Sequence, residues 1–171
     1  MTHGKSLVLK KLTPDDGEDI YAMLQEIPAD ENGLINPAHG KTYEEYKAWL
    51  ERANANSLLT GIVDGWKVPE TIFWLYEDGK PVGFGKLRHF LTDALRESGG
   101  NIGYAIAPAA RGRGLGKALV AGLIEEGRKI GIESLLFTVK NHNTPSIRAA
   151  VANGGVIEKV TDERHYITIV L

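Results

Sequence analysis

The segment at residues 101–131, NIGYAIAPAARGRGLGKALVAGLIEEGRKIG, constrains the fold of this chain more than any other. Its pattern predicts a strand over 102–107, a tight glycine-rich turn and an amphipathic helix that ends at Gly131. Glycines at 112, 114 and 116 let another molecule approach the backbone closely, although a bare strand-to-helix turn uses glycine too. Because such a turn exposes backbone N–H groups at a helix N-terminus, we expect it to bind an anion, most simply a phosphate.

Two common phosphate-binding patterns do not fit this turn. A P-loop requires a glycine five residues before Gly116 and a Ser or Thr after Lys117, where this chain has Arg111 and Ala118. A dinucleotide fingerprint requires the spacing G-x-G-x-x-G and an acidic residue about 20 residues further on. The glycines here alternate, and the following strand, SLLFTV, contains no acid. The turn therefore belongs to neither class.

The rest of the chain reads as alternating strands and helices. Thr13 and Pro14 predict a helix start that continues to Glu26, and Thr42 with Glu45 predicts a capping box at the start of a second helix. Strands are expected at 6–12, at 71–77 and 80–91 around an Asp-Gly turn, at 102–107, at 134–139 parallel to 102–107, and at 156–161 and 164–171. Loops are expected at 27–41, 54–70 and 92–100.

The resulting order, β-α-α-β-β-β-α-β-α-β-β, predicts an α/β fold of the α+β type. A mixed, mostly antiparallel sheet would be flanked by helices, in a single domain over residues 1–171. If the last segment, RHYITIVL, lay at the sheet edge, it would pair with a second copy in a homodimer.

Composition excludes several classes of function. The 171 residues include no cysteine, so no disulfide, thiolate metal site or cysteine nucleophile exists. The net charge of −2 argues against nucleic acid as a partner, and the five histidines are too scattered to indicate a metal site. No apolar run reaches the ~18–20 residues of a membrane span. We expect a cytoplasmic protein without a metal or a membrane partner.

With these classes set aside, the turn resembles the core motif of the GNAT superfamily of N-acetyltransferases. That motif is Gln or Arg, two residues, Gly, any residue, then Gly or Ala, and Arg111, Gly114 and Gly116 match it. The preceding AIAP and the segment NTPSIRAAVANGG, an Asn followed by a short helix, also resemble family motifs. These motifs occupy about residues 101–156. Within the superfamily, the RH pair at 88–89 and the GGNIGY segment resemble predicted acetyltransferases of unassigned substrate.

The resemblance implies acetyl-CoA as co-substrate. Its pyrophosphate would lie on the turn, its pantetheine arm along the strand, and the N–H groups of Ile106 and Ala107 would polarise the thioester. Asn143 would bond to the arm, or alternatively cap the helix, and Arg113 and Lys117 would add contacts or simply be solvated. The predicted coenzyme-binding residues are Ile106, Ala107, Arg111, Gly112, Arg113, Gly114, Leu115, Gly116, Lys117, Asn143 and Ser146.

The usual catalytic groups of the family are missing. Residues 99–105 contain no carboxylate to act as general base, and Ala150 stands where many relatives have a tyrosine acid. His89 is the candidate base and Arg88 a residue that orients substrate, with Glu97 and a water chain as alternatives. Ser146, Tyr104 and Tyr166 are substitutes for the acid, unless the thiolate leaves unaided.

We therefore predict transfer of acetyl from acetyl-CoA to a primary amine of a small molecule or peptide. Direct attack in a ternary complex is expected, since no cysteine can carry an acyl intermediate. The alternatives are a coenzyme-binding sensor or regulatory domain without catalysis, and a scaffold protein. Specificity is expected from 27–41, 54–70 and 92–100.

Overall fold

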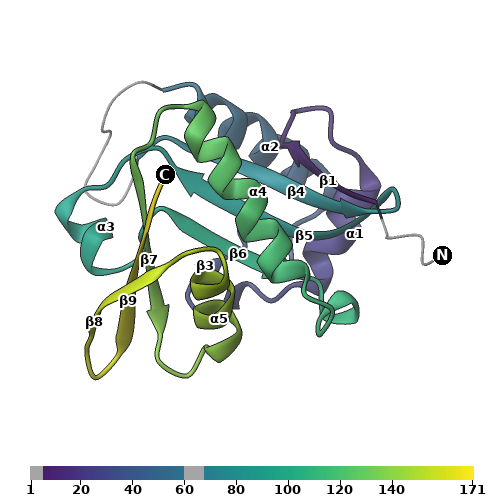
Figure 1. Ribbon diagram of the computed structural model, residues 1–171. Helices are drawn as coiled ribbons and strands as arrows, with labels where there is room; N and C mark the ends of the chain where they lie inside the picture. Colours follow the sequence, from purple (N-terminus) through teal and green to yellow (C-terminus); the bar gives the residue numbers. More distant parts are fainter. Residues whose placement is uncertain (1–5, 60–67) are drawn as a thin grey trace.

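The computed structural model describes residues 6–59 and 68–171, in which helices lie on both sides of the larger β-sheet (Figure 1). Part of the stretch expected to be irregular, residues 60–67, lies outside the described residues. The elements are β1 (Leu7–Lys11), α1 (Glu18–Glu26), β2 (Asp30–Glu31), β3 (Leu34–Ile35), α2 (Tyr43–Ser57), β4 (Glu70–Glu77), β5 (Lys80–Arg88), α3 (Asp93–Glu97), β6 (Ile102–Ile106), a 3-10 turn (Pro108–Ala110), α4 (Leu115–Lys129), β7 (Ser134–Lys140), α5 (Thr144–Ala152), β8 (Val156–Val160) and β9 (Arg164–Val170).

The larger sheet has the strand order β1-β4-β5-β6, and its ladders are antiparallel. The predicted hairpin between β4 and β5 is confirmed. Asp78 and Gly79 both have positive φ, 49° and 79°, as a primed two-residue turn requires. This hairpin fixes the centre of the sheet, and β6 forms its free edge.

A second sheet, of order β7-β9-β8, begins where the first one ends. The parallel pairing expected between 102–107 and 134–139 is not present, because no ladder joins β6 to β7 in the described chain. The two strands are joined near Asn101, whose N–H donates to the Leu136 carbonyl and whose side-chain oxygen accepts from the Leu136 N–H, both at 2.8 Å. Gly100 permits this approach, since a Cβ there would lie 2.4 Å from the Leu136 carbonyl oxygen.

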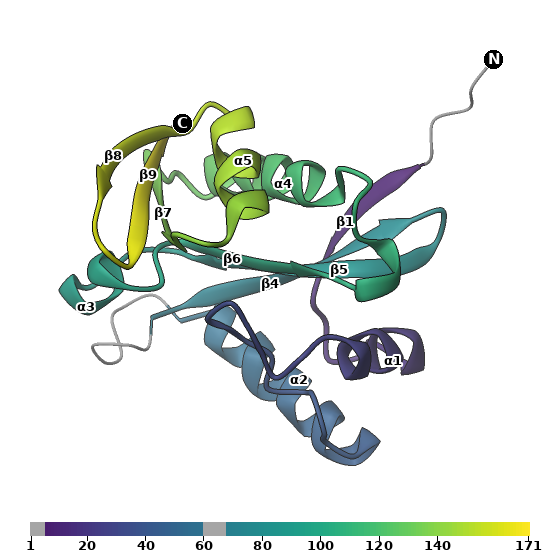
Figure 2. The same cartoon turned by 90° about the horizontal axis from the view of Figure 1, so that it is seen from below.

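Helices cover both faces of the larger sheet (Figure 2). On one face, α1 and α2 pack over Trp74 and Phe84. On the other face, α4 places Leu115, Leu119 and Leu123 at a spacing of four residues against the core, with α5 beside it. The fold class and the predicted order of main elements are confirmed, with short β2, β3 and α3 added where loops were expected.

The first helix starts later than predicted. Asp16 accepts from the Thr13 N–H at 2.8 Å and from the buried Trp74 indole at 2.7 Å, so residues 13–16 form a turn and α1 begins at Glu18. The capping box at Thr42 and Glu45 is confirmed, and α2 continues to Ser57 through the start of the expected irregular stretch.

The C-terminal strand β9 does not lie at a sheet edge. It pairs with β7 on one side and β8 on the other. The condition set for dimerisation through RHYITIVL is therefore not met, and the exposed edge of this sheet is β8.

Candidate functional site

A cavity of about 710 Å³ opens beside the end of β6. This volume lies within the range of about 300–1,000 Å³ that is common for small-molecule sites. Its walls are the end of β6, the glycine turn, the start of α4 and one side of α5. The lining residues are Glu31, Asn32, Tyr104, Ala105, Ile106, Ala110, Arg111, Gly112, Gly114, Leu115, Gly116, Lys117, His142, Asn143, Pro145, Ser146, Arg148, Ala149 and Ala152.

The glycine turn presents the uncapped start of α4 to this cavity. Gly112 and Gly114 have φ of 80° and 77°, a left-handed conformation that other residues rarely adopt. Gly114 is the N-cap and has no side chain to bond the helix, whose first turn closes only with Ala118 N–H to the Gly114 carbonyl at 3.3 Å. The helix supplies no acceptor for the N–H groups of residues 115–117, which therefore favour an anion.

The edge of β6 leads to this turn. The Ala107 N–H donates to the Val82 carbonyl at 2.8 Å, so it belongs to the sheet, and Ala107 does not line the cavity. Because N–H groups alternate sides along a strand, the Ile106 N–H points the other way, toward the open edge. Arg111 donates from Nε to the Ile106 carbonyl at 3.0 Å. Ile106 and Ala107 were both predicted to contact the thioester. Of these two residues, only Ile106 has a backbone N–H that faces outward from the sheet.

The start of α5 forms the opposite wall. Asn143 occupies the N-cap position, but its side chain makes no capping hydrogen bond in the described chain and lines the cavity instead. Ser146 Oγ lies 3.1 Å from the Tyr104 hydroxyl. Burial raises the pKa of Tyr104, and the hydrogen bond with Ser146 partly opposes this. Ala150 is fully buried, so the wall carries a hydroxyl from β6 and none from position 150.

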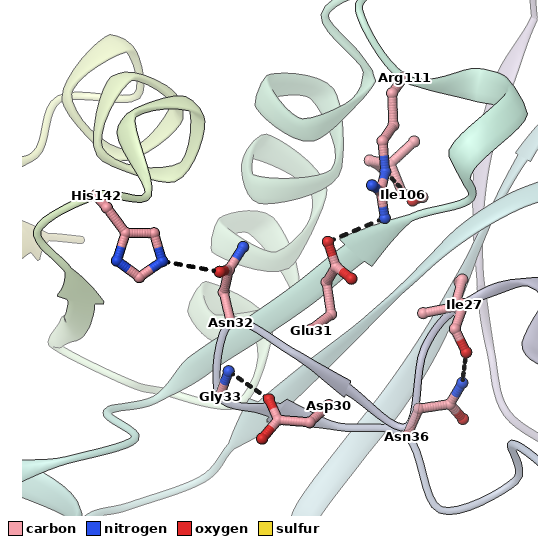
Figure 3. Close-up of polar contacts among 9 residues, drawn as sticks. All are labelled: Ile27, Asp30, Glu31, Asn32, Gly33, Asn36, Ile106, Arg111 and His142. Carbon is pink, nitrogen blue, oxygen red and sulfur yellow. Dashed lines mark hydrogen bonds and ion pairs between the residues drawn. The ribbon is translucent and has the colours of Figure 1, made fainter.

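Glu31 and Asn32 of the β2–β3 hairpin line the cavity, and their side chains point toward Arg111 and His142 (Figure 3). Glu31 accepts from Arg111 Nη2 at 3.0 Å, and Asn32 Oδ1 lies 3.1 Å from His142 Nε2. One short hairpin thus contacts both the glycine turn and the loop that precedes α5. The sequence gives Pro and Gly signals for a loop here, but nothing in it indicates these partners.

A smaller cavity of about 150 Å³ adjoins the first beneath this hairpin. Five residues line both cavities, namely Glu31, Asn32, Tyr104, Asn143 and Ser146. Arg88, predicted to orient substrate, lines the small cavity. The shared residues make the two cavities parts of one continuous site.

Three residues of the predicted coenzyme-binding and catalytic set lie outside both cavity linings, namely Ala107, Arg113 and His89, and so do the alternatives Glu97 and Tyr166. Arg113 donates to both carboxylate oxygens of Glu77, at 2.7 and 2.9 Å. His89 Nε2 lies 2.7 Å from Thr71 Oγ1, and the pKa of His89 is lowered by burial and by Lys11, against Glu70. The other nine predicted coenzyme-binding residues line the large cavity together.

Over residues 6–59 and 68–171, no group of three or more His, Cys, Asp or Glu side chains is placed to hold a metal ion. None of the helices in the same ranges is long and apolar enough to span a membrane.

Residues 23–154 match the acetyltransferase (GNAT) family. The chain belongs to this family. Solved GNAT structures share its fold at low identity: the GNAT acetyltransferase from Streptococcus pneumoniae is 16% identical, with a TM-score of 0.65 over 97% of this chain and 99% of that one. No curated protein matches the chain.

Two further structures carry acetyl-CoA. The acetyltransferase yncA from Salmonella typhimurium, solved with acetyl-CoA, is 17% identical, with a TM-score of 0.59 over 96% of this chain and 94% of that one. The microcin C7 self-immunity acetyltransferase MccE, solved with acetyl-CoA and AMP, is 15% identical, with a TM-score of 0.68 over 96% and 92% of the two chains. At these identities the likeness establishes the GNAT fold.

Proposed function

We propose that this GNAT protein transfers the acetyl group of acetyl-CoA to a primary amine by direct attack in a ternary complex. The observation that carries this proposal is the continuous path from the open edge of β6 to the uncapped start of α4 inside one large cavity. A long ligand that combines an amide-rich arm with a pyrophosphate matches this path. The family relatives yncA and MccE, solved with acetyl-CoA, support that choice of ligand.

The backbone would hold most of the coenzyme. The pyrophosphate would accept hydrogen bonds from the N–H groups of residues 115–117, where the helix dipole adds a favourable field. Lys117 lines the same wall and would add a cationic side chain. The pantetheine arm would lie along β6, between the outward N–H of Ile106 and the side chains of Asn143 and Ser146. The Ile106 N–H would then stabilise the oxyanion.

The reaction requires a neutral amine. Its nitrogen attacks the thioester carbonyl, the N–C bond forms, the C–S bond breaks and the coenzyme leaves as thiolate. A lysine-like amine has a pKa near 10.4 and must first lose a proton. We retain His89 as the proposed base, because its lowered pKa keeps it neutral at pH 7. Since His89 lies outside both cavities, the proton would pass through water. Glu31 is the competing base, as a carboxylate that lines both cavities.

Tyr104 is the proposed acid for the departing thiolate. Its raised pKa keeps the hydroxyl protonated, and Ser146 positions it at the wall that both cavities share. Tyr166, another substitute considered above, donates to the Glu97 carbonyl at 2.8 Å and lines neither cavity. The hydroxyl that relatives place on the short helix would thus come from β6.

A sensor domain that binds acetyl-CoA without turning it over is the second candidate. The fully buried Ala150 and the absence of a carboxylate at 99–105 favour it. Two measurements distinguish the transferase from the sensor domain. Acetyl-CoA at a hundred times its Kd should stabilise the protein by about 2.7 kcal/mol in either case, whereas no stabilisation would contradict both. Thiol release over a panel of primary amines then distinguishes the transferase, which releases thiol, from the sensor, which does not.

A further inference from the structure

The small cavity is lined by an excess of positive charge. Lys86, Arg88, Lys140 and Arg164 line it, and the carboxylate among its lining residues is Glu31, which is already paired with Arg111 at 3.0 Å. The whole chain carries a net charge of −2, so this excess is local and not a property of the surface. Like charges that gather in a partly enclosed cavity repel each other unless an anion joins them.

Two of these cations face each other across a strand pair. Lys140 at the end of β7 is the direct partner of Arg164 at the start of β9. Side chains at directly opposed positions share a face of the sheet, and like charges there are destabilising. Across the described residues, no carboxylate lies within ion-pair distance of either one. This unfavourable pair is explained if both residues share an anionic ligand.

Two contacts hold Arg88 in place and leave some of its N–H donors available. Its Nη1 donates to the Gly100 carbonyl at 2.9 Å, and Glu70, which lies outside the cavity lining, is 3.7 Å from its Nε. A guanidinium has five N–H donors, so these two contacts orient it and leave other donors available for a ligand. A fixed guanidinium with remaining donors is suited to a carboxylate or phosphate.

Lys86 also lines the small cavity and adds positive charge to it. The residue is 8% exposed, and its Nζ donates to the Ile35 carbonyl of the hairpin at 2.7 Å. Burial lowers the pKa of Lys86, with Arg88 acting in the same direction and Glu70 opposing. Buried lysines are uncommon, and an anion in the cavity would add to the stabilisation that Glu70 gives the charged form of this one.

We propose that the small cavity binds an acidic group of the acceptor, so that the acceptor is a small amine that also carries a carboxylate or phosphate. This inference rests on the proposed acetyltransferase function. Arg88, Lys140 and Arg164 bind the acidic group, while the amine faces the zone shared by both cavities, where Glu31 supplies a negative charge. The pyrophosphate of the coenzyme does not compete, because its site is the start of α4 at the far side of the large cavity.

Matched acceptors test the proposal. β-Alanine is compared with its amide, γ-aminobutyrate with its amide, and phosphoethanolamine with ethanolamine, each by the rate of thiol release from acetyl-CoA. We expect kcat/KM for the acidic member of at least one pair to exceed that of its neutral partner by about tenfold or more, the effect of one charge-assisted contact. The carboxylate and phosphate pairs show which acid is bound. Equal rates within every pair, or a preference for the neutral members, would overturn the proposal.

Substitutions test whether residues of the small cavity cause the preference for acidic acceptors. Arg164→Gln and Lys140→Gln should each reduce the preference for the acidic member about tenfold while leaving the KM for acetyl-CoA within twofold. Lys129→Gln, an exposed lysine paired with Glu126 on α4, is the matched control and should change neither. A rise in the KM for acetyl-CoA in Arg164→Gln would assign the small cavity to the coenzyme and overturn the proposal.

A binding measurement separates this proposal from the proposed activity. Thermal melting in the presence of coenzyme A is followed with β-alanine and with its amide, in the native protein and in Arg164→Gln. Stabilisation by the acid alone, lost in Arg164→Gln, supports the anion site even if no amine is acetylated. Acetylation of amines with no effect of their charge on either rate or melting retains the transferase and refutes the anion site.

Discussion

The two cavities of this GNAT protein are built in different ways. The groups proposed to bind the coenzyme in the large one are chiefly main chain: the edge of β6, two left-handed glycines and the N–H groups at the start of α4. The charged groups of the small one are side chains that come from β5, β7, β9 and the β2–β3 hairpin. A site made of backbone depends on where glycines and strands fall in the sequence. A site made of side chains depends on which distant residues the fold brings together.

The largest expected effect concerns the proposed base, His89, a side chain that lies outside both cavities. We expect kcat to fall only as the pH drops below 6.5, the ordinary pKa of histidine, because a protonated His89 cannot accept a proton and burial lowers the pKa of His89 from that value. His89→Gln should remove this acid limb and lower kcat about a hundredfold, with little change in the Kd of acetyl-CoA. The measurement is kcat over a pH series.

His165→Gln is the control for this substitution, because His165 bonds to Asn141 at 2.8 Å and lines neither cavity. If kcat in His89→Gln equals that of the native protein at every pH, His89 has no part in the reaction. The same series in Glu31→Gln would then show whether the base lies in the hairpin.

Tyr104→Phe probes the wall that the cavities share. Loss of the hydroxyl should lower kcat roughly thirtyfold, less than a typical acid–base substitution, because a thiol with a pKa near 8.5 is a tolerable leaving group. Acetyl-CoA affinity should stay within twofold, as measured by calorimetric titration. Tyr166→Phe removes a hydroxyl outside both cavities and should leave kcat unchanged. Equal losses in the two variants would remove Tyr104 from the role of acid.

A pair of glycines sharpens the argument for a backbone site. Gly114 and Gly131 lie at opposite ends of α4 with φ of 77° and 83°, and at both positions a Cβ would meet no atom within 4 Å. Alanine at either position should cost about 1–2 kcal/mol of stability from the left-handed backbone. Gly114→Ala alone should also raise the Kd of acetyl-CoA, by about tenfold, since it disturbs the N–H groups that face the anion. Equal Kd values for both variants would contradict a pyrophosphate site at this turn.

The smallest expected effect concerns the hairpin. Glu31→Gln releases Arg111 from its ion pair, which is partly exposed and therefore worth only about 0.2–1 kcal/mol. If Arg111 contacts the coenzyme, its release should tighten acetyl-CoA binding about two- to threefold in a calorimetric titration at low salt. Glu126→Gln removes a partly buried carboxylate that is paired with Lys129 outside both cavities, and it serves as control. Weaker binding in Glu31→Gln would mean that the ion pair supports the coenzyme site.

The contrast between the cavities also explains what could be predicted from the sequence. The Asp78-Gly79 hairpin, the Thr42 capping box and the glycine turn rest on local conformational preferences, and the structure contains all three. Asp16 was expected within the first helix, but the distant Trp74 holds it in a turn. The facing pair of Lys140 and Arg164 and the contact of Glu31 with Arg111 join residues that no local pattern connects.

The separation of β6 from β7 is another feature that local sequence patterns do not predict. A strand, a helix and a strand predict a parallel pair, yet pairing stops after the single junction of Asn101 with Leu136. The buried side chain of Asn101 also donates to the Arg88 carbonyl at 3.0 Å, so it joins the two sheets without a ladder. Residues of both sheets line the small cavity beside this junction.

Amide hydrogen exchange with and without acetyl-CoA, resolved by residue, measures directly whether the backbone of β6 and α4 holds the coenzyme. We expect slower exchange at Ile106 and at residues 115–117 when acetyl-CoA is bound, because these N–H groups gain acceptors. The Ala107 amide, already bonded to the Val82 carbonyl, should change little and serves as an internal reference. Binding of acetyl-CoA without protection at Ile106 and residues 115–117 would contradict a coenzyme site built from the backbone of β6 and α4.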